Sequence, residues 1–168
     1  MDELITIEPY SANWPVLFAA ERALLENVLG PWLAGPIEHV GSTAVPGLAA
    51  KPIIDMMAAV RGLEQSHGAI PALERLGYCY APYRQEVMHW LCKPTPTHRT
   101  HHLHLVPYSS PLWNERLIFR DRLRSDGRVA DEYAELKRRL AQVHQKDREA
   151  YTEAKSSFIN RVVRGAAQ

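Results

Sequence analysis

The segment from Pro52 to Val60 reads PIIDMMAAV and is apolar at every position except Asp55. A continuous apolar run of this length is typical of a central β-strand whose two faces are both buried. An ionised carboxylate is costly to bury without a partner, so Asp55 needs a reason to stand in such a strand. The run therefore predicts a buried strand and marks Asp55 as a candidate functional residue.

Hydrophobic periodicity predicts helices and short strands in the rest of the chain. Apolar residues repeat at the helical period from Trp14 to Leu29 and indicate an amphipathic helix that Gly30-Pro31 ends. The LITIEP segment near the start reads as a short strand or an extended arm, and 43–51 as at most a short helix and a turn. Further helices are expected at 63–76, 112–124, 129–144 and 147–164, and short strands at 36–40, 78–80, 86–92 and 99–108, of which the last two form a long hairpin around the Lys93–Thr97 turn.

The chain has 168 residues, 46% of them hydrophobic, and contains no internal repeat or long linker. We therefore expect one domain over 1–168, with a sheet-bearing core at about 1–110 and a helical tail at about 111–168. Cys79 and Cys92 form neither a disulfide framework nor a zinc-ligand pattern, which favours a reducing cytoplasm. The N-terminal segment is acidic where a signal peptide is basic, and no apolar run reaches about 18 residues, so no membrane partner is expected.

The formal net charge is +1, from 20 basic and 19 acidic residues. This balance argues against nucleic acid as a partner, because tight binding that is independent of sequence needs a basic surface. Residues 1–113 carry 7 basic and 10 acidic side chains, whereas 114–168 carry 13 and 9. The arginine-rich excess in the tail suits phosphate or carboxylate recognition, although charges at helical spacing also form solvated faces.

Gly41, Ser42 and Thr43 follow the strand expected at 36–40 and precede the strand that bears Asp55. A glycine at such a turn lets the backbone approach a ligand closely, and the hydroxyls and amides that follow favour an anion. Asp55 would then hold a divalent cation that bridges to this anion. Gly-Ser-Thr is also ordinary turn and cap chemistry, so both interpretations stay open.

The second concentration of candidate residues is Thr100 to Leu105, THHLHL. Side chains alternate along a strand, so His102 and His104 point to the same face and can reach one metal ion. If this strand neighbours that of Asp55, two imidazoles and one carboxylate meet at one site with positions left for water or substrate. The alternative is a strand of polar residues satisfied by hydrogen bonds.

Three further residues extend these two motifs. Lys51 precedes the Asp55 strand and is a candidate phosphate ligand, or else a solvated loop lysine. Arg120 shares a helix face with Arg124 at i,i+4 and is either part of a phosphate clamp or an intrahelical ion-pair partner. His39 ends the strand before the Gly-Ser turn, where a structural role is favoured.

Together the segments IEHVGSTAVPGLAAKPIIDM, THHLHL, FRDRLR and YAELKRRLA resemble the GrpB family, whose members look like the nucleotidyltransferase superfamily. The resemblance covers nearly the whole chain. It implies an α/β (α+β) fold with a small mixed sheet flanked by helices and a helical C-terminal segment. It also implies that the Gly-Ser turn and Asp55 stand where the superfamily holds a nucleotide triphosphate and its metal.

One position departs from the superfamily pattern. Nucleotidyltransferases of this kind carry two acids two residues apart, but Met57 follows Asp55 at that spacing. A thioether does not replace a carboxylate towards magnesium, because hard cations need oxygen ligands. The position of a third acid on a later strand corresponds to His102 and His104.

Three functions follow from these residues. The first is binding of a nucleotide or another phosphorylated small molecule with a divalent metal (Mg, Mn or Zn), with nucleotidyl transfer as a candidate reaction. In it, Asp55, His102 and His104 are the candidate metal and catalytic residues, and the candidate phosphate ligands are Gly41, Ser42, Thr43, Lys51 and Arg120. The second is a ligand-binding or interaction module without catalysis, and the third is a metal-dependent phosphoesterase. The sequence leaves the acceptor and the oligomeric state open.

Overall fold

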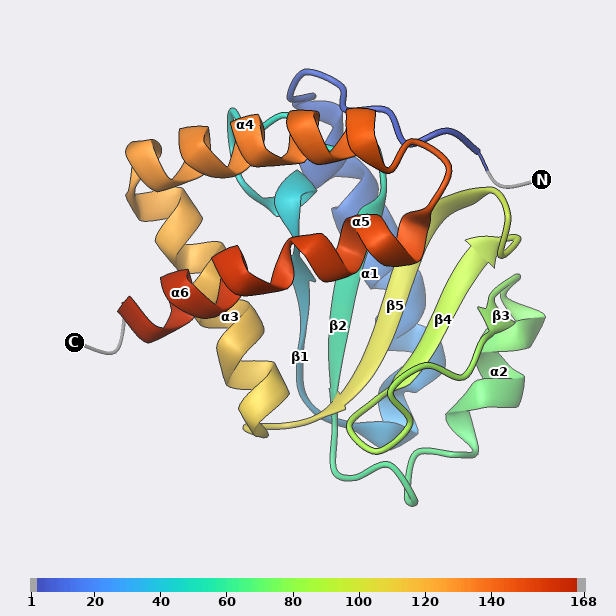
Figure 1. Cartoon of the computed structure of the whole chain (residues 1–168). Helices are drawn as coiled ribbons and strands as arrows, with labels where there is room; N and C mark the ends of the chain where they lie inside the picture. The colour runs from blue at the N-terminus through green and yellow to red at the C-terminus, as the bar shows by residue number, and fades with distance from the viewer. Residues whose placement is uncertain (1–2, 166–168) are drawn as a thin grey trace.

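The computed structural model describes residues 3–165, which form a sheet in the order β1-β2-β5-β4-β3 (Figure 1). Only β2 and β5 pair in parallel, and the other neighbours are antiparallel. The sheet is therefore mixed, as expected. The strands are β1 (Leu33–Val40), β2 (Ile54–Val60), β3 (Cys79–Tyr80), β4 (His89–Pro94) and β5 (Arg99–Pro107).

Helices cover both faces of this sheet. In Figure 1, α1 (Asn13–Leu29) lies behind the strands, and α3 (Pro111–Ser125), α4 (Gly127–Val143), α5 (Arg148–Ala154) and α6 (Ser156–Gly165) lie in front. Helix α2 (Ala69–Arg75) packs with α1 into the same apolar cluster. The expected α/β fold, with a mixed sheet flanked by helices and a helical C-terminal segment, is confirmed.

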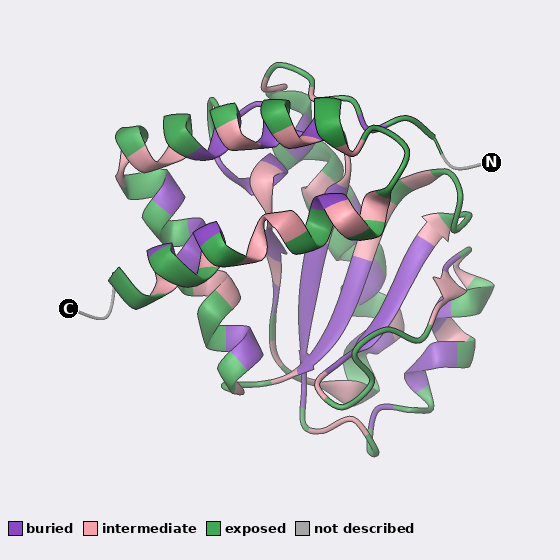
Figure 2. Cartoon of the chain, viewed as in Figure 1, coloured by how far each residue is buried: buried purple, intermediate pink, exposed green. Residues whose placement is uncertain are grey.

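Alternation along β2 and β5 gives the two faces of the sheet different roles. On the face towards α1, Met56 pairs with Leu103 in a fully buried cluster. On the face towards α3, Asp55 pairs with His102, and Met57 with His104. Figure 2 shows the central strands buried and the helices exposed on their outer sides. The sheet thus presents charged and imidazole groups inside the layer of C-terminal helices.

The N-termini of three front helices are fixed by capping side chains. Ser110 accepts a hydrogen bond from the Trp113 amide at the start of α3, and Asp126 caps α4 in the same way. Asp147 caps α5. These caps satisfy amides that the helix itself leaves unbonded. Within residues 3–165, none of the helices has both the length and the apolar character needed to cross a lipid bilayer.

Two expected helices are shorter than the periodicity indicates. The helix expected at 63–76 is helical only over α2, because the Ser66 hydroxyl donates to the carbonyls of Gly62 and Leu63 and holds a turn there. The helix expected at 147–164 is divided at Lys155 into α5 and α6. The N-terminal segment, expected as a short strand or an extended arm, forms no strand in the described residues and makes one bridge, between Glu8 and Ala50.

Candidate metal and anion site

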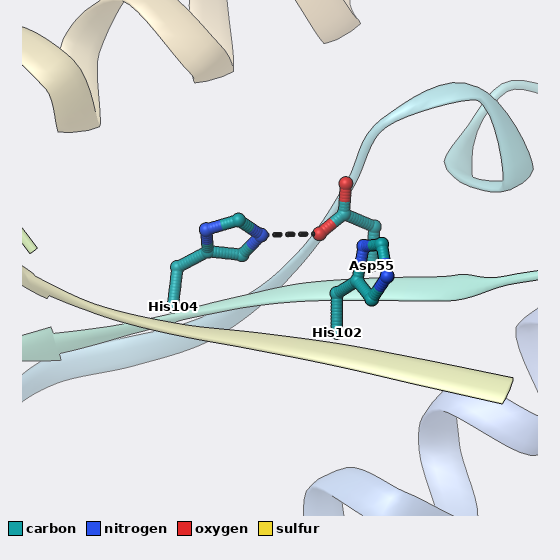
Figure 3. Close-up of side chains that lie close together, drawn as sticks. All are labelled: Asp55, His102 and His104. Carbon is teal, nitrogen blue, oxygen red and sulfur yellow. Dashed lines mark hydrogen bonds and ion pairs between the residues drawn. The ribbon is translucent and has the colours of Figure 1, made fainter. Parts of the chain in front are cut away.

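Asp55, His102 and His104 lie together on the sheet face that the C-terminal helices cover (Figure 3). The parallel pairing of β2 with β5 sets Asp55 opposite His102, and His104 follows two residues later on the same face. One ligand atom from each side chain lies within 4.8 Å of the other two. The Asp55 side chain keeps 28% of its surface exposed, so this carboxylate is only partly shielded from solvent.

A short hydrogen bond joins Asp55 to His104, with 2.7 Å between Oδ1 and Nε2. Burial raises the pKa of Asp55, but the charge and hydrogen bond of His104, together with His102 and Arg116, outweigh it and lower the pKa well below its usual range. Burial, with Arg116, lowers the pKa of His104. The carboxylate of Asp55 is therefore ionised and accepts a hydrogen bond from His104 Nε2.

His102 is the side chain of this group whose bonding is incomplete. Its Nε2 atom is buried and has no hydrogen-bond partner. Burial lowers the pKa of His102 to about 3, which keeps its ring neutral at physiological pH. The Trp90 ring packs edge-on against it at 5.1 Å between centroids. A neutral imidazole nitrogen without a partner, next to an ionised carboxylate, is suited to bind a metal ion.

Gly41 leaves the space that the Asp55 carboxylate occupies. Its φ is +71°, a conformation that favours glycine, and a Cβ atom there would lie 2.9 Å from Asp55 Oδ2. Ser42 follows in the short 3-10 helix η2 (Ser42–Ala44), where its side chain lies near the Tyr133 hydroxyl. The structure thus brings the Gly-Ser turn and Asp55 together.

Replacing Gly41 by Ala is expected to lower the free energy of unfolding by about 2–4 kcal/mol, because the new Cβ adds a steric conflict with Asp55 to the strain of a positive φ. Gly47 is the matched control, since its φ is +81° and no atom lies within 4 Å of the added Cβ. Gly47→Ala should cost only about 1 kcal/mol. Urea unfolding of both variants measures the difference, and equal losses would contradict the close contact at Gly41.

Two of the expected phosphate ligands are bonded within the protein. The Thr43 hydroxyl donates to the Ile53 carbonyl at 2.9 Å and accepts from His39 Nε2 at 2.9 Å. Arg120 donates to Glu38 at 2.6 Å and to Asp121 at 2.8 Å. Thr43 and His39 therefore tie the turn to the start of β2, and Arg120 ties α3 to the edge strand β1.

Lys51 and Met57 are the remaining residues that the sequence singles out near Asp55. Lys51 lies close enough to Asp55 for the carboxylate to oppose the loss of its proton, although burial and nearby arginines lower its pKa to about 8. Met57 is fully buried in an apolar cluster with Val40, Met88 and Trp113. The position at which the superfamily pattern has its second acid is therefore occupied by a core methionine.

Three residues near the site escaped the sequence analysis. Arg116 on α3 approaches Met88 with 3.9 Å between Nη2 and Sδ, and its charge lowers the pKa of Asp55. Met88 also lies 3.3 Å from His104 Nδ1. The charge of Asp55 also acts on Lys155, where it raises the pKa of the amine. A signal for Lys155 was present, because it stands in an apolar helical stripe with Tyr151, Phe158 and Val162.

The donor set restricts which metals fit. One carboxylate and two imidazoles suit zinc, manganese or iron, whereas magnesium is usually bound by oxygen ligands alone. A metal at Nε2 of His104 would require the proton to move to Nδ1, where Met88 Sδ is a weak acceptor. The unpartnered nitrogen of His102 and the ionised Asp55 would provide the other two ligands, so the residues present fit a divalent transition metal.

Fold and site together define a small α/β protein with a carboxylate and two histidines on the covered face of a mixed sheet. The family model described as GrpB protein matches residues 4–164, so the chain belongs to the GrpB family. This confirms the resemblance found in the sequence, and placement in the nucleotidyltransferase-like superfamily is consistent with it.

Similar proteins match along almost the entire chain. A UPF0157 protein of Pseudomonas aeruginosa is 40% identical over 167 residues, which cover 96% of this chain and 67% of that protein. The glutamate-rich protein GrpB of Alkalihalophilus pseudofirmus is 34% identical, over 95% of this chain and 94% of its own. The crystal structure of the conserved protein GrpB from Enterococcus faecalis has a TM-score of 0.85 at 33% identity and 96% coverage of both chains.

Proposed function

We propose that this GrpB protein binds a phosphorylated small molecule, with a nucleotide as the first candidate, through a divalent metal ion held by Asp55, His102 and His104. The observation that carries the proposal is the buried, unpartnered Nε2 of His102 in a group whose ligand atoms lie within 4.8 Å of one another. A bound metal would supply positive charge to a phosphate oxygen. The Gly-Ser turn beside Asp55 supports the anion part of the proposal.

The residues around the site define what the chain itself contributes. Asp55 supplies the negative charge that a cation needs, and Arg116 and Lys51 supply positive charge for phosphate oxygens. Met57 argues against a pair of magnesium ions, because the second carboxylate of the superfamily pattern is missing. This observation favours a binding module without catalysis as the second candidate, whereas the grouping of Asp55, His102 and His104 supports a metal-dependent phosphoesterase as the third.

Titration calorimetry on protein freed of metal by a chelator tests the metal part. We expect one Zn²⁺ or Mn²⁺ per chain, bound more tightly than Mg²⁺, and a loss of at least about tenfold in affinity for His102→Ala. His98→Ala is the matched control, because His98 is exposed on the hairpin turn, and it should bind like the wild type. If His102→Ala binds the metal with wild-type affinity, His102 is not a metal ligand.

The ligand and the reaction are separated by two further measurements on the metal-loaded protein. Nucleotides and phosphate monoesters are titrated into it, and binding that depends on the metal supports the proposal. Labelled ATP is then incubated with the protein and candidate acceptors. Release of pyrophosphate indicates nucleotidyl transfer, release of phosphate from esters indicates a phosphoesterase, and binding without either product indicates a binding module.

A further inference from the structure

Three buried or half-buried lysines lie near one another, and two of them, Lys51 and Lys155, lie within reach of the charge of Asp55. Lys51 lies between η2 and β2, Lys137 lies on α4, and Lys155 lies at the break between α5 and α6. Among residues 3–165, none of the three forms an ion pair with a carboxylate. Buried ammonium groups are usually paired, so this arrangement lacks the negative charge that normally accompanies it.

Aromatic rings provide most of the contacts that these ammonium groups make. Lys155 Nζ lies 4.4 Å from the centre of the Tyr151 ring, and Lys51 Nζ lies 4.9 Å from the same centre. Lys137 Nζ lies over the Tyr133 ring and donates to the Ala49 carbonyl. The ammonium groups of Lys51 and Lys155 lie over the same Tyr151 ring and repel each other. Their attraction to the face of the ring compensates this repulsion only in part.

The charges that face the lysines are predominantly positive. Burial, followed by neighbouring cations, lowers the pKa of Lys51 to about 8 and those of Lys137 and Lys155 to about 7. Asp55 is the acid that opposes this shift for Lys51 and Lys155. The charged groups that lower these pKa values are Lys51, Arg99, Arg138, Arg148 and Lys155.

We propose that Lys51 and Lys155 form an anion subsite next to the metal ligands, which takes a second oxyanionic group of the ligand, a phosphate or a carboxylate. Lys137 is only 2% exposed, and its charge lies near those of Lys51 and Lys155. The inference rests on the proposed function for the metal-bound group and adds a second anionic group to the same ligand. Arg120, by contrast, is already neutralised by Glu38 and Asp121.

Titration calorimetry with pyrophosphate, inorganic phosphate and malonate, in chelator and without metal, tests the subsite. We expect wild-type protein to bind pyrophosphate or malonate, and Lys155→Gln and Lys51→Gln to lose at least about tenfold in affinity. Lys146→Gln is the control, because Lys146 is exposed between α4 and α5, and it should stay within about twofold of the wild type. Circular dichroism verifies that each variant is folded.

The outcomes separate the subsite from the metal site. If pyrophosphate binds more tightly than malonate, the group that the subsite takes is a phosphate. If malonate binds more tightly, that group is a carboxylate. Asp55→Asn should lose the metal but retain the anion, since it removes a negative charge near the lysines. Binding at neutral pH should take up protons, measured in buffers of different ionisation enthalpy, because an anion raises the pKa values of the amines. Unchanged affinity in both lysine variants, or a folded wild-type protein that binds none of these anions, would overturn the subsite.

Discussion

Asp55→Asn lowers the affinity of the metal-free protein for Zn²⁺ and Mn²⁺ by at least about a hundredfold, a larger loss than for either histidine. Asp55 is the charged member of the three candidate ligands, and its low pKa leaves it ionised at every pH at which the protein would bind metal. Asparagine has the same shape and still accepts the hydrogen bond from His104. The change therefore removes the charge and keeps the packing.

Competition with a metal-chelating dye measures this affinity over several orders of magnitude. Asp121→Asn is the matched control, because it removes the same charge from an exposed side chain on α3 and leaves the site intact. We expect this control to bind metal like the wild type. If Asp55→Asn and Asp121→Asn bind equally well, the carboxylate of Asp55 is not a ligand.

The second large effect is a loss of stability in mild acid. Burial lowers the pKa of His39 to about 4 and that of His102 to about 3, whereas both lie near 6.5 in the unfolded chain. Below pH 6.5 the unfolded state therefore binds more protons than the folded state, and the stability falls as the pH falls. Each such group contributes up to about 1.4 kcal/mol per pH unit between its two pKa values.

Urea unfolding of the metal-free protein at pH 7, 6 and 5 measures this slope. We expect the free energy of unfolding to fall by at least about 2 kcal/mol from pH 6 to pH 5. The low pKa of Asp55 adds little to this loss, because its own contribution to stability is lost only at lower pH, below about the unfolded-state pKa of 3.9. His39→Gln keeps a donor for Thr43 and should show a shallower slope. A wild-type stability that is the same at pH 5 and pH 7 would show that these histidines are not buried in neutral form.

The sequence predicted the local parts of the site because alternation and periodicity are local properties. The apolar run around Asp55 indicated a buried strand, and the spacing of His102 and His104 placed both on one face. Local patterns do not predict that β5 lies beside β2, because strand order depends on contacts between distant segments. β3 and β4 intervene in the sequence but lie outside β5 in the sheet.

The arginines of α3 show why the remaining residues could not be identified from spacing. Arg116 and Arg120 are four residues apart and share a face of the helix, about 6 Å apart along its axis. That distance separates the surroundings of Met88 from those of Glu38 on β1. Whether Arg116 or Arg120 is directed towards the site depends on how α3 lies across the sheet. Local sequence patterns do not predict how the helix is placed.

The break at Lys155 has the same origin. Periodicity predicts a continuous helix over 147–164, but α5 and α6 divide at Lys155, and this lysine lies against Tyr151. Lys51, more than a hundred residues earlier in the chain, lies over the same ring. Local helical propensity carries no information about such contacts.

Anomalous diffraction from crystals soaked in Zn²⁺ or Mn²⁺ tests the central claim most directly. We expect one strong peak bound by Asp55, His102 and His104 at about 2.0–2.2 Å from an oxygen and two nitrogen atoms. Crystals of the Asp55→Asn variant, soaked in the same way, should show no peak at this position. Peaks only at other positions in the wild type, with the hydrogen bond between Asp55 and His104 intact, would contradict a metal site on this face of the sheet.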